Sequence, residues 1–164
     1  MSIAQKLLAE LNYEASNTRK VLERLPDEHF DWKPHEKSFS LGQLAAHIAN
    51  LPSWLTIALS TDEFDLATGG LARTDDKNFN DVMNRFESKI KSATEALEIA
   101  SDEKLKGTWI LKKGGVKILE LPRVGVIRSM VMNHTIHHRG EMIVYMRLLN
   151  LKVPGLYGPS ADEQ

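Results

Sequence analysis

Hydrophobic residues recur every three or four positions along most of the chain, which predicts long amphipathic helices joined by polar connections. We expect four helices, at about 2–25, 40–60, 76–100 and 122–149. Ser2 and Gln5 have the spacing of a capping box that begins the first helix. Ser40 and Gln43 have the same spacing at the start of the second. Pro52 lies inside that second helix and should bend it, because proline removes one backbone hydrogen bond.

Two connections carry signals of their own. The segment 61–75 is polar, acidic and glycine-bearing, and it is long for a tight helical hairpin, so a crossover along the bundle is expected. Two β-rich runs flank Lys113-Gly114-Gly115, which predicts a small β-hairpin near 108–119 that leans on the helices. The pattern as a whole therefore predicts an all-α fold, a four-helix bundle with a long crossover between its second and third helices.

Composition narrows the class of protein. The 164 residues are 42% hydrophobic and 26% charged, values that indicate one soluble globular domain over 1–164. A net charge of −1 without any basic block argues against nucleic acid and anionic lipid as partners. The absence of cysteine excludes disulfides and thiolate metal sites, which leaves nitrogen and oxygen ligands. With no signal-peptide pattern and no apolar run near the roughly 18 residues of a membrane span, we expect a cytoplasmic protein.

Three histidines fall in the middle of predicted apolar stripes. His134 and His138 are four residues apart, so they lie within roughly 40° of each other on one helix face. Their stripe also contains Val124, Ile127, Val131, Met142, Tyr145 and Leu149. His47 is placed likewise in the second helix. An i, i+4 pair and one ligand from a facing helix can direct three ring nitrogens at a common ion, whereas the alternative is three hydrogen-bonded core histidines. His137 points about 60° to one side of His134, so it is expected at the rim of such a metal site or behind its ligands.

Two further polar positions need an explanation. Glu141 lies one turn after His138, where it could be a fourth ligand, an acceptor that fixes a histidine tautomer, or a general base. The alternative for this carboxylate is a surface ion pair with Arg139 or Arg147. In the first helix Glu14 and Thr18 fall inside the apolar stripe, which indicates either a wet end of the bundle or the lining of a pocket. The signature His-Glu-x-x-His is missing, which disfavours a protease of that type.

Four segments carry a resemblance to a known family. They are Asp31-Trp32-x-Pro34, the run Ser40-Leu-Gly-Gln-Leu-Ala-Ala-His47 followed by Trp54, Asn133-His134-x-x-x-His138-Arg-Gly, and the tail Val153-Pro-Gly-Leu-Tyr-Gly-Pro-Ser. Together they resemble the DinB/YfiT-like family of metal-binding four-helix bundles, most closely its DinB-2 branch. The resemblance implies an up-down-down-up bundle, a divalent ion (most often nickel or zinc) on His47, His134 and His138, and a homodimer.

The same resemblance implies a reaction class. Relatives include transferases and isomerases that use small thiols such as bacillithiol or mycothiol, and some metal-dependent hydrolases, in which the ion acidifies a thiol or water that attacks an electrophile. We therefore expect a metal-dependent S-transferase whose partners are a small-molecule thiol and an electrophile. The alternatives are a non-enzymatic metal-binding or stress-response module and a hydrolase with Glu141 as its base. The family usually has Gln at position 141, so Glu141 is a departure that puts the transfer of metal identity in doubt.

Overall fold

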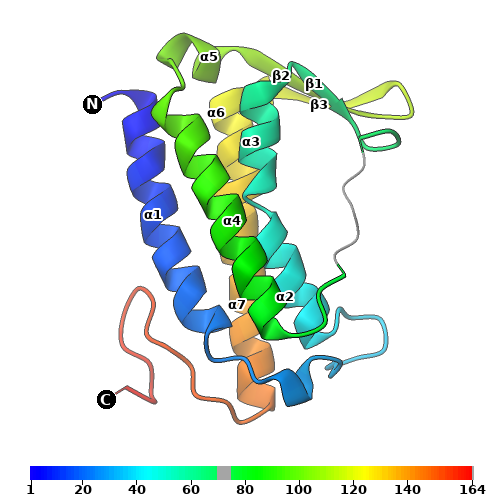
Figure 1. Ribbon diagram of the computed structural model, residues 1–164, viewed down its shortest axis with the longest axis vertical. Helices are drawn as coiled ribbons and strands as arrows, with labels where there is room; N and C mark the ends of the chain where they lie inside the picture. The colour runs from blue at the N-terminus through cyan, green and yellow to red at the C-terminus, as the bar shows by residue number, and fades with distance from the viewer. Residues whose placement is uncertain (70–74, 164) are drawn as a thin grey trace.

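The structure, a computed structural model that describes residues 1–69 and 75–163, is mostly helical with one small sheet (Figure 1). The helices are α1 (Ile3–Leu22), α2 (Leu41–Asn50), α3 (Ser53–Ser60), α4 (Phe79–Glu98), α5 (Asp102–Lys106), α6 (Arg123–Val126) and α7 (His134–Leu148). A 3-10 turn, Asp27–His29, follows α1, and a π-helical segment, Ile127–Asn133, joins α6 to α7. None of the described helices combines the length and hydropathy that crossing a membrane requires.

The predicted starts of the first two helices are confirmed, and the second helix is irregular at Pro52 as expected. The Ser2 hydroxyl accepts a hydrogen bond from the Gln5 amide while the Gln5 side chain accepts one from the Ser2 amide. Ser40 and Gln43 form the same reciprocal pair at the start of α2. These boxes satisfy amide groups that have no partner inside a helix. At Pro52 the second predicted helix is interrupted and divides into α2 and α3.

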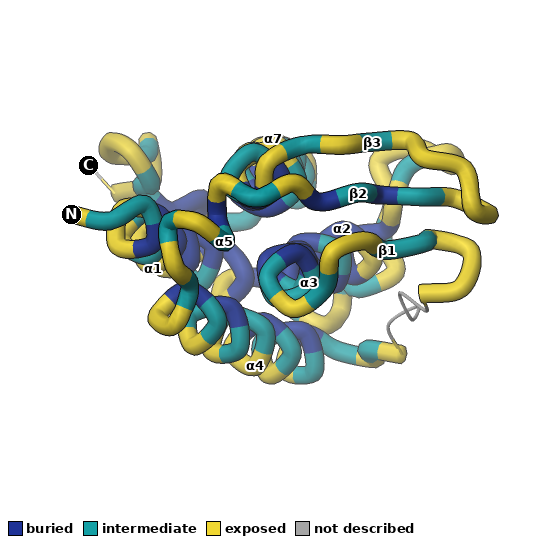
Figure 2. Tube along the Cα trace, turned by 90° about the horizontal axis from the view of Figure 1, so that it is seen from above, coloured by how far each residue is buried: buried dark blue, intermediate teal, exposed yellow. Residues whose placement is uncertain are grey.

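The long helices bury their apolar faces against one another. Helix α4 packs against α1, α2 and α3, while α7 packs against α1 and α2. In the view along the helices, buried positions face inward and exposed positions face outward (Figure 2). One apolar cluster contains Trp54, Leu97, Trp109 and Ile127, and a second contains Leu22, Leu44, Phe86, Met142 and Met146. Ile90 of α4 packs against both clusters, so the core continues along the helices.

The predicted β-hairpin is present. Strand β2 (Thr108–Lys113) pairs antiparallel with β3 (Val116–Pro122), which makes the hairpin slightly longer than the pattern indicated. Gly114 and Gly115 form the turn with φ angles of 60° and 79°. Both angles lie in the left-handed region that glycine adopts without steric cost, which explains the two consecutive glycines.

A third strand was not predicted. Strand β1 (Glu63–Asp65) lies within the expected crossover and pairs in parallel with β2. The Asp65 carboxylate accepts hydrogen bonds from the amides of Gly114 and Gly115, so this short strand also holds the hairpin turn. Three residues, two of them acidic, give no alternating pattern from which a strand could be predicted. Residues 70–74 of the crossover lie outside the described residues.

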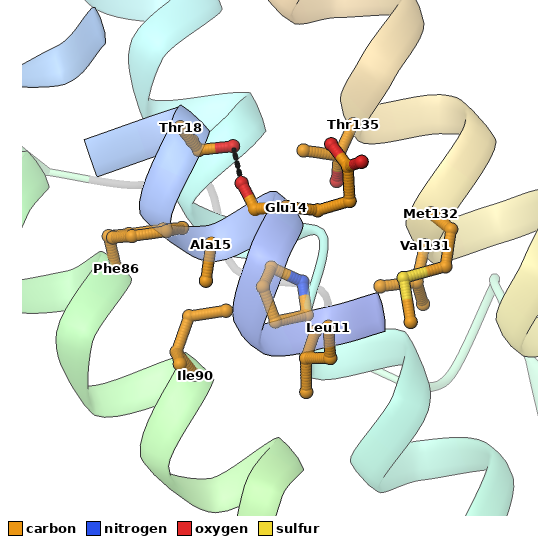
Figure 3. A pocket seen from close by; sticks show the side chains of 10 residues that line it. Leu11, Glu14, Ala15, Thr18, Phe86, Ile90, Val131, Met132 and Thr135 are labelled. Atoms are coloured by element: carbon orange, nitrogen blue, oxygen red, sulfur yellow. Dashed lines mark hydrogen bonds between the residues drawn. The ribbon is translucent and has the colours of Figure 1, made fainter. Parts of the chain in front are cut away.

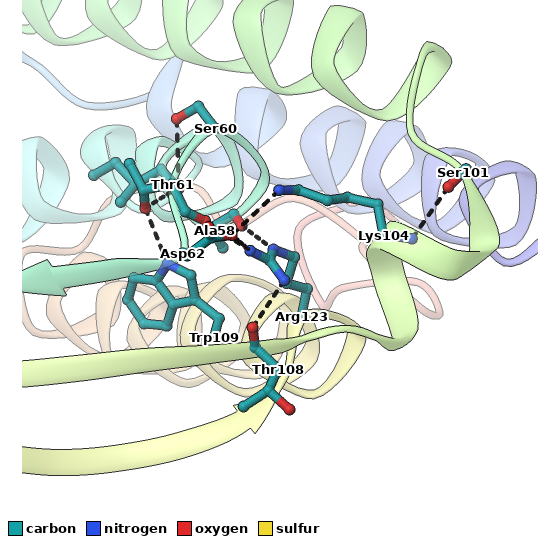
Figure 4. A network of polar contacts seen from close by, with 10 residues as sticks. Ala58, Ser60, Thr61, Asp62, Ser101, Lys104, Thr108, Trp109 and Arg123 are labelled. Carbon is teal, nitrogen blue, oxygen red and sulfur yellow. Dashed lines mark hydrogen bonds and ion pairs between the residues drawn. The ribbon is translucent and has the colours of Figure 1, made fainter.

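A buried arginine joins the sheet to the helices (Figure 4). The Arg123 side chain is 4% exposed and donates to the carbonyl oxygens of Ala58, Thr61 and Thr108 at 2.7–2.8 Å. It also pairs with the carboxylate of Asp62 at 2.5 Å. Two of these carbonyls belong to the C-terminal end of α3, where the helix leaves acceptors unsatisfied. Arg123 therefore caps α3 and attaches β2 and α6 to it.

Candidate metal centre

Three histidine side chains meet between α2 and α7. Helix α2 supplies His47, and the first two turns of α7 supply His134 and His138. The Nε2 atom of His134 lies 3.4 Å from Nε2 of His47 and 2.9 Å from Nε2 of His138. All three residues are half-buried, so the cluster lies at the edge of the core with access from solvent. The structure thus brings together the three residues that the sequence singled out.

The location of the histidines in the core stripe was predicted wrongly. The buried positions of α7 are Thr135, Arg139, Met142 and Met146, and the two histidines lie beside this stripe. The prediction assumed one continuous α-helix from 122 to 149, whereas Ile127–Asn133 is π-helical. A π-helical turn holds an extra residue, so the helical phase read from Ile127 does not carry over to His134. Such segments are rare and occur frequently at functional sites.

The donor set fits a divalent ion of borderline softness. Four ligands at 2.0–2.1 Å around a tetrahedral ion are separated from one another by about 3.3 Å, and the two Nε2 separations of 3.4 and 2.9 Å are close to this value. Imidazole is a ligand for zinc, nickel, copper and iron. The three histidines can therefore all bind one ion through their Nε2 atoms. A metal is therefore compatible with the cluster on the chemistry and the spacing of its donors.

Glu141 lies behind His138 on the side away from the cluster. Its Oε2 atom is 2.6 Å from Nδ1 of His138, so the carboxylate accepts the Nδ1–H hydrogen bond and leaves Nε2 with a lone pair. The proposed surface pairs are not formed, because Arg139 binds Glu14 and Arg147 binds Asp162. Of the roles considered for Glu141, this geometry favours the acceptor that sets a histidine tautomer.

The cluster favours neutral imidazoles. Burial, followed by the neighbouring His138 and His134, lowers the pKa of His47 from 6.5 to about 4, while Glu141 opposes the shift. Burial also lowers the pKa of His134, partly offset by hydrogen bonding to the Met130 backbone. The neutral ring is the form that binds a metal, so these shifts favour the ligand form of His47 and His134 near neutral pH.

These shifts predict that the metal-free protein loses stability in acid. Between the unfolded pKa of 6.5 and the folded value of about 4 for His47, the unfolded chain binds more protons than the folded chain. The contribution of His47 to folding stability is therefore fully present above pH 6.5 and is lost as the pH falls from 6.5 to about 4. Urea unfolding with chelator present, at neutral pH and at about pH 5, measures the change. His47→Gln should reduce the pH dependence, and an unchanged dependence would contradict the assignment.

Aromatic side chains border the cluster on the α2 side. The ring of Phe39 is 48% exposed and its centroid lies 5.8 Å from that of His47. Trp32 and Tyr145 meet edge to face at 5.6 Å, and the Tyr145 hydroxyl donates to the Phe39 carbonyl at 3.4 Å. The connection before α2 thus folds back over the start of this helix and places apolar surface next to the histidines.

Beside the cluster lies a buried ion pair that sequence reasoning missed. The Arg139 side chain is 2% exposed, and its Nη2 atom lies 2.5 Å from Oε2 of Glu14. Its Nη1 atom donates to the Glu14 carbonyl and to the Thr18 hydroxyl, each at 3.0 Å. Tyr157 of the C-terminal tail contacts Arg139 and donates to Glu14 at 2.7 Å. The suggestion of a wet bundle end is therefore wrong, since Glu14 and Thr18 are buried partners of Arg139.

The same helix faces enclose only a small internal cavity (Figure 3). Glu14, Thr18 and Thr135 line it together with apolar side chains of α1, α4 and the π-helical segment. Its volume is about 10 Å³, which is barely the room for one water molecule. Glu14 and Thr18 therefore do line a cavity, as one of the two predictions had it, but this cavity is too small for a substrate.

Comparison with known proteins identifies the family. Uncharacterized protein YrdA of Bacillus subtilis (strain 168) is 26% identical over 162 residues, covering 95% of this chain and 89% of that protein. A crystal structure of a DinB-like protein from Bacillus cereus ATCC 10987 has a TM-score of 0.73 at 22% identity, covering 95% of this chain and 98% of that one. A DinB-like protein (YjoA) from Bacillus subtilis has a TM-score of 0.73 at 17% identity, covering 94% and 99%.

These structural likenesses show a shared fold. The DinB family model matches residues 1–164, and that match agrees with the motifs around His47 and His134. The chain therefore belongs to the DinB family.

Proposed function

We propose that this DinB protein holds a divalent ion, nickel or zinc, on His47, His134 and His138, and transfers a small thiol to an electrophile. One observation carries the metal part. Glu141 accepts a hydrogen bond from the Nδ1–H of His138, so Nε2 of this ring presents a lone pair towards Nε2 of His134. These two Nε2 atoms are 2.9 Å apart, near the spacing of about 3.3 Å between two nitrogen ligands of one tetrahedral ion.

The fold supports a site of catalytic rather than structural type. Three neutral protein ligands leave coordination positions open, whereas structural zinc sites are usually closed by four protein ligands. A divalent ion bound there would lower the pKa of a coordinated thiol or water towards neutrality. Glu141 would keep His138 in the ligand tautomer, and Phe39 would present an apolar surface next to His47.

We also propose a four-helix-bundle description of the fold. Counting α2 and α3 as one helix bent at Pro52, and α6, the π-helical segment and α7 as another, gives four long helices with α1 and α4. In the up-down-down-up order that the family resemblance implies, the crossover is the connection from α3 to α4. This description places the metal ligands on the second and fourth helices of the bundle.

The position of Glu141 and the number of histidine ligands favour the transferase over the two alternatives. A hydrolase needs a base that reaches the substrate, whereas Glu141 is held against Nδ1 of His138, on the side away from the other two histidines. A non-enzymatic metal-binding or stress-response module would be better served by a closed ligand set, and the described residues within reach supply three histidines.

The activity is tested with protein purified without a metal-affinity tag. Loaded with nickel or zinc and given bacillithiol or a simpler thiol, the protein should accelerate conjugation to members of an electrophile panel. The acceleration should disappear in His134→Ala. A metal-loaded protein that conjugates no thiol to any electrophile would overturn the transferase, and a saturated coordination sphere would favour the module instead.

Glu141 is expected to set the strength of metal binding. Glu141→Gln keeps a hydrogen-bond acceptor but removes the charge behind His138, and Glu141→Ala removes both. Loss of such a partner typically weakens metal binding by about 10- to 100-fold, so we expect about tenfold for Gln and more for Ala. Competition with a chromophoric chelator measures the affinity. Equal affinities in all three proteins would show that Glu141 does not act on the site.

A further inference from the structure

The two carboxylate oxygens of Glu141 face different histidines. Oε2 lies 2.6 Å from Nδ1 of His138, while Oε1 lies 3.3 Å from Nε2 of His137. The second pair is on the outer face of α7, where the side chains of His137 and Glu141 are 64% and 43% exposed. Oε2 thus binds a histidine of the three-histidine cluster. Oε1 and Nε2 of His137 lie together on the solvent-exposed side of the helix.

This outer pair has the arrangement of two metal ligands. Residues four apart on a helix lie one above the other, so His137 and Glu141 can reach one ion without a change of backbone. Their separation of 3.3 Å equals the spacing of about 3.3 Å between two ligands at 2.0–2.1 Å on a tetrahedral centre. Within the part of the chain that the structure describes, the ion pairs of Glu141 are to histidines alone, so no Lys or Arg nitrogen neutralises its charge.

We propose that His137 and Glu141 form a second, weaker site for a borderline divalent cation such as zinc, nickel or copper. An imidazole combined with a carboxylate favours these ions over magnesium and calcium, which prefer oxygen ligands throughout. The exposure of both side chains leaves the remaining positions to water. Two protein ligands instead of three make this outer site the weaker one.

The outer site regulates the inner one, and only this step rests on the proposed function. A cation on Oε1 draws charge away from Oε2, so the Glu141 carboxylate becomes a poorer acceptor for His138. The hydrogen bond that makes His138 a stronger ligand is then weakened. Because binding free energies are coupled reciprocally, an ion in the inner site weakens the outer site by the same factor. Occupation of the outer site therefore lowers the affinity of the inner site for its ion.

Zinc titration of tag-free, metal-free protein against a chromophoric chelator tests the proposal. The wild type should bind in a tight and a weak phase. His137→Ala should lose the weak phase and keep the tight one, and His35→Ala, which removes an exposed loop histidine, should keep both. His134→Ala should lose the tight phase. Its weak phase should tighten by about fivefold or more, the lower end of typical coupling, because the inner ion is gone.

The outcomes separate the two proposals. A weak phase that persists in His137→Ala, or a wild type with a single phase that His137→Ala leaves intact, overturns the outer site. An outer affinity that is equal in His134→Ala and the wild type overturns the coupling. A wild type without a tight phase, but with a weak phase that disappears in His137→Ala, contradicts the three-histidine metal centre while supporting the outer site.

Discussion

His134→Ala is expected to reduce the metal content of the purified protein to background. The Nε2 atom of His134 lies within 3.4 Å of the corresponding atom of His47 and within 2.9 Å of that of His138. Removing the shared neighbour leaves two imidazoles, which is fewer than the three protein ligands of open zinc sites. Elemental analysis of tag-free protein measures the loss, and one equivalent of metal should raise the unfolding temperature of the variant less than that of the wild type.

The matched control is His35→Ala, which removes an exposed histidine from the connection before α2. It should leave the metal content unchanged. If His134→Ala and the wild type carry equal amounts of metal, the three histidines are core residues and the proposed function fails with them.

Arg139→Met is expected to lower the free energy of unfolding by about 3–5 kcal/mol, because it leaves the carboxylate of Glu14 buried without its partner. The guanidinium also holds the Thr18 hydroxyl and contacts Tyr157, so α1, α7 and the C-terminal tail lose a common contact. Urea unfolding in the presence of chelator gives the value free of any metal effect.

Two further variants identify the cause. Arg139→Met combined with Glu14→Leu removes both charges and should recover much of the loss, since apolar replacements of a buried pair are often tolerated. Arg128→Met breaks an exposed pair with Glu10 and should cost less than about 1 kcal/mol. If Arg139→Met costs no more than Arg128→Met, burial of the Glu14 charge is not what makes the pair important.

Local signals could be predicted from sequence because they involve neighbouring residues. Ser40 and Gln43 form their capping box within one turn, and Pro52 interrupts a helix through its own ring. The strand Glu63–Asp65 could not be predicted, because it exists only through pairing with β2, which lies more than forty residues further along the chain. The π-helical segment was missed for a similar reason, since no local pattern distinguishes it from an α-helix.

The types and spacing of the residues predicted the site better than their expected rotational positions on the helices did. Two histidines four apart and a third in another helix predicted the cluster, although their position relative to the core stripe was wrong. The hydrogen bond from His138 to Glu141 was one of several options until side-chain positions decided it. Arg139 and Glu14 are 125 residues apart, so nothing near either one indicated that they would meet in the core.

The π-helical segment Ile127–Asn133 also decides how this chain tolerates insertion and deletion. A surface loop absorbs a lost residue with little effect, but a lost residue here would let the backbone relax into a regular α-helix. Helix α7 would then turn about its axis relative to α6, and His134 and His138 would face a different neighbour than His47. A gene with every ligand codon intact would then encode a protein without the cluster, so the site depends on the length of this stretch as well as on its residue types.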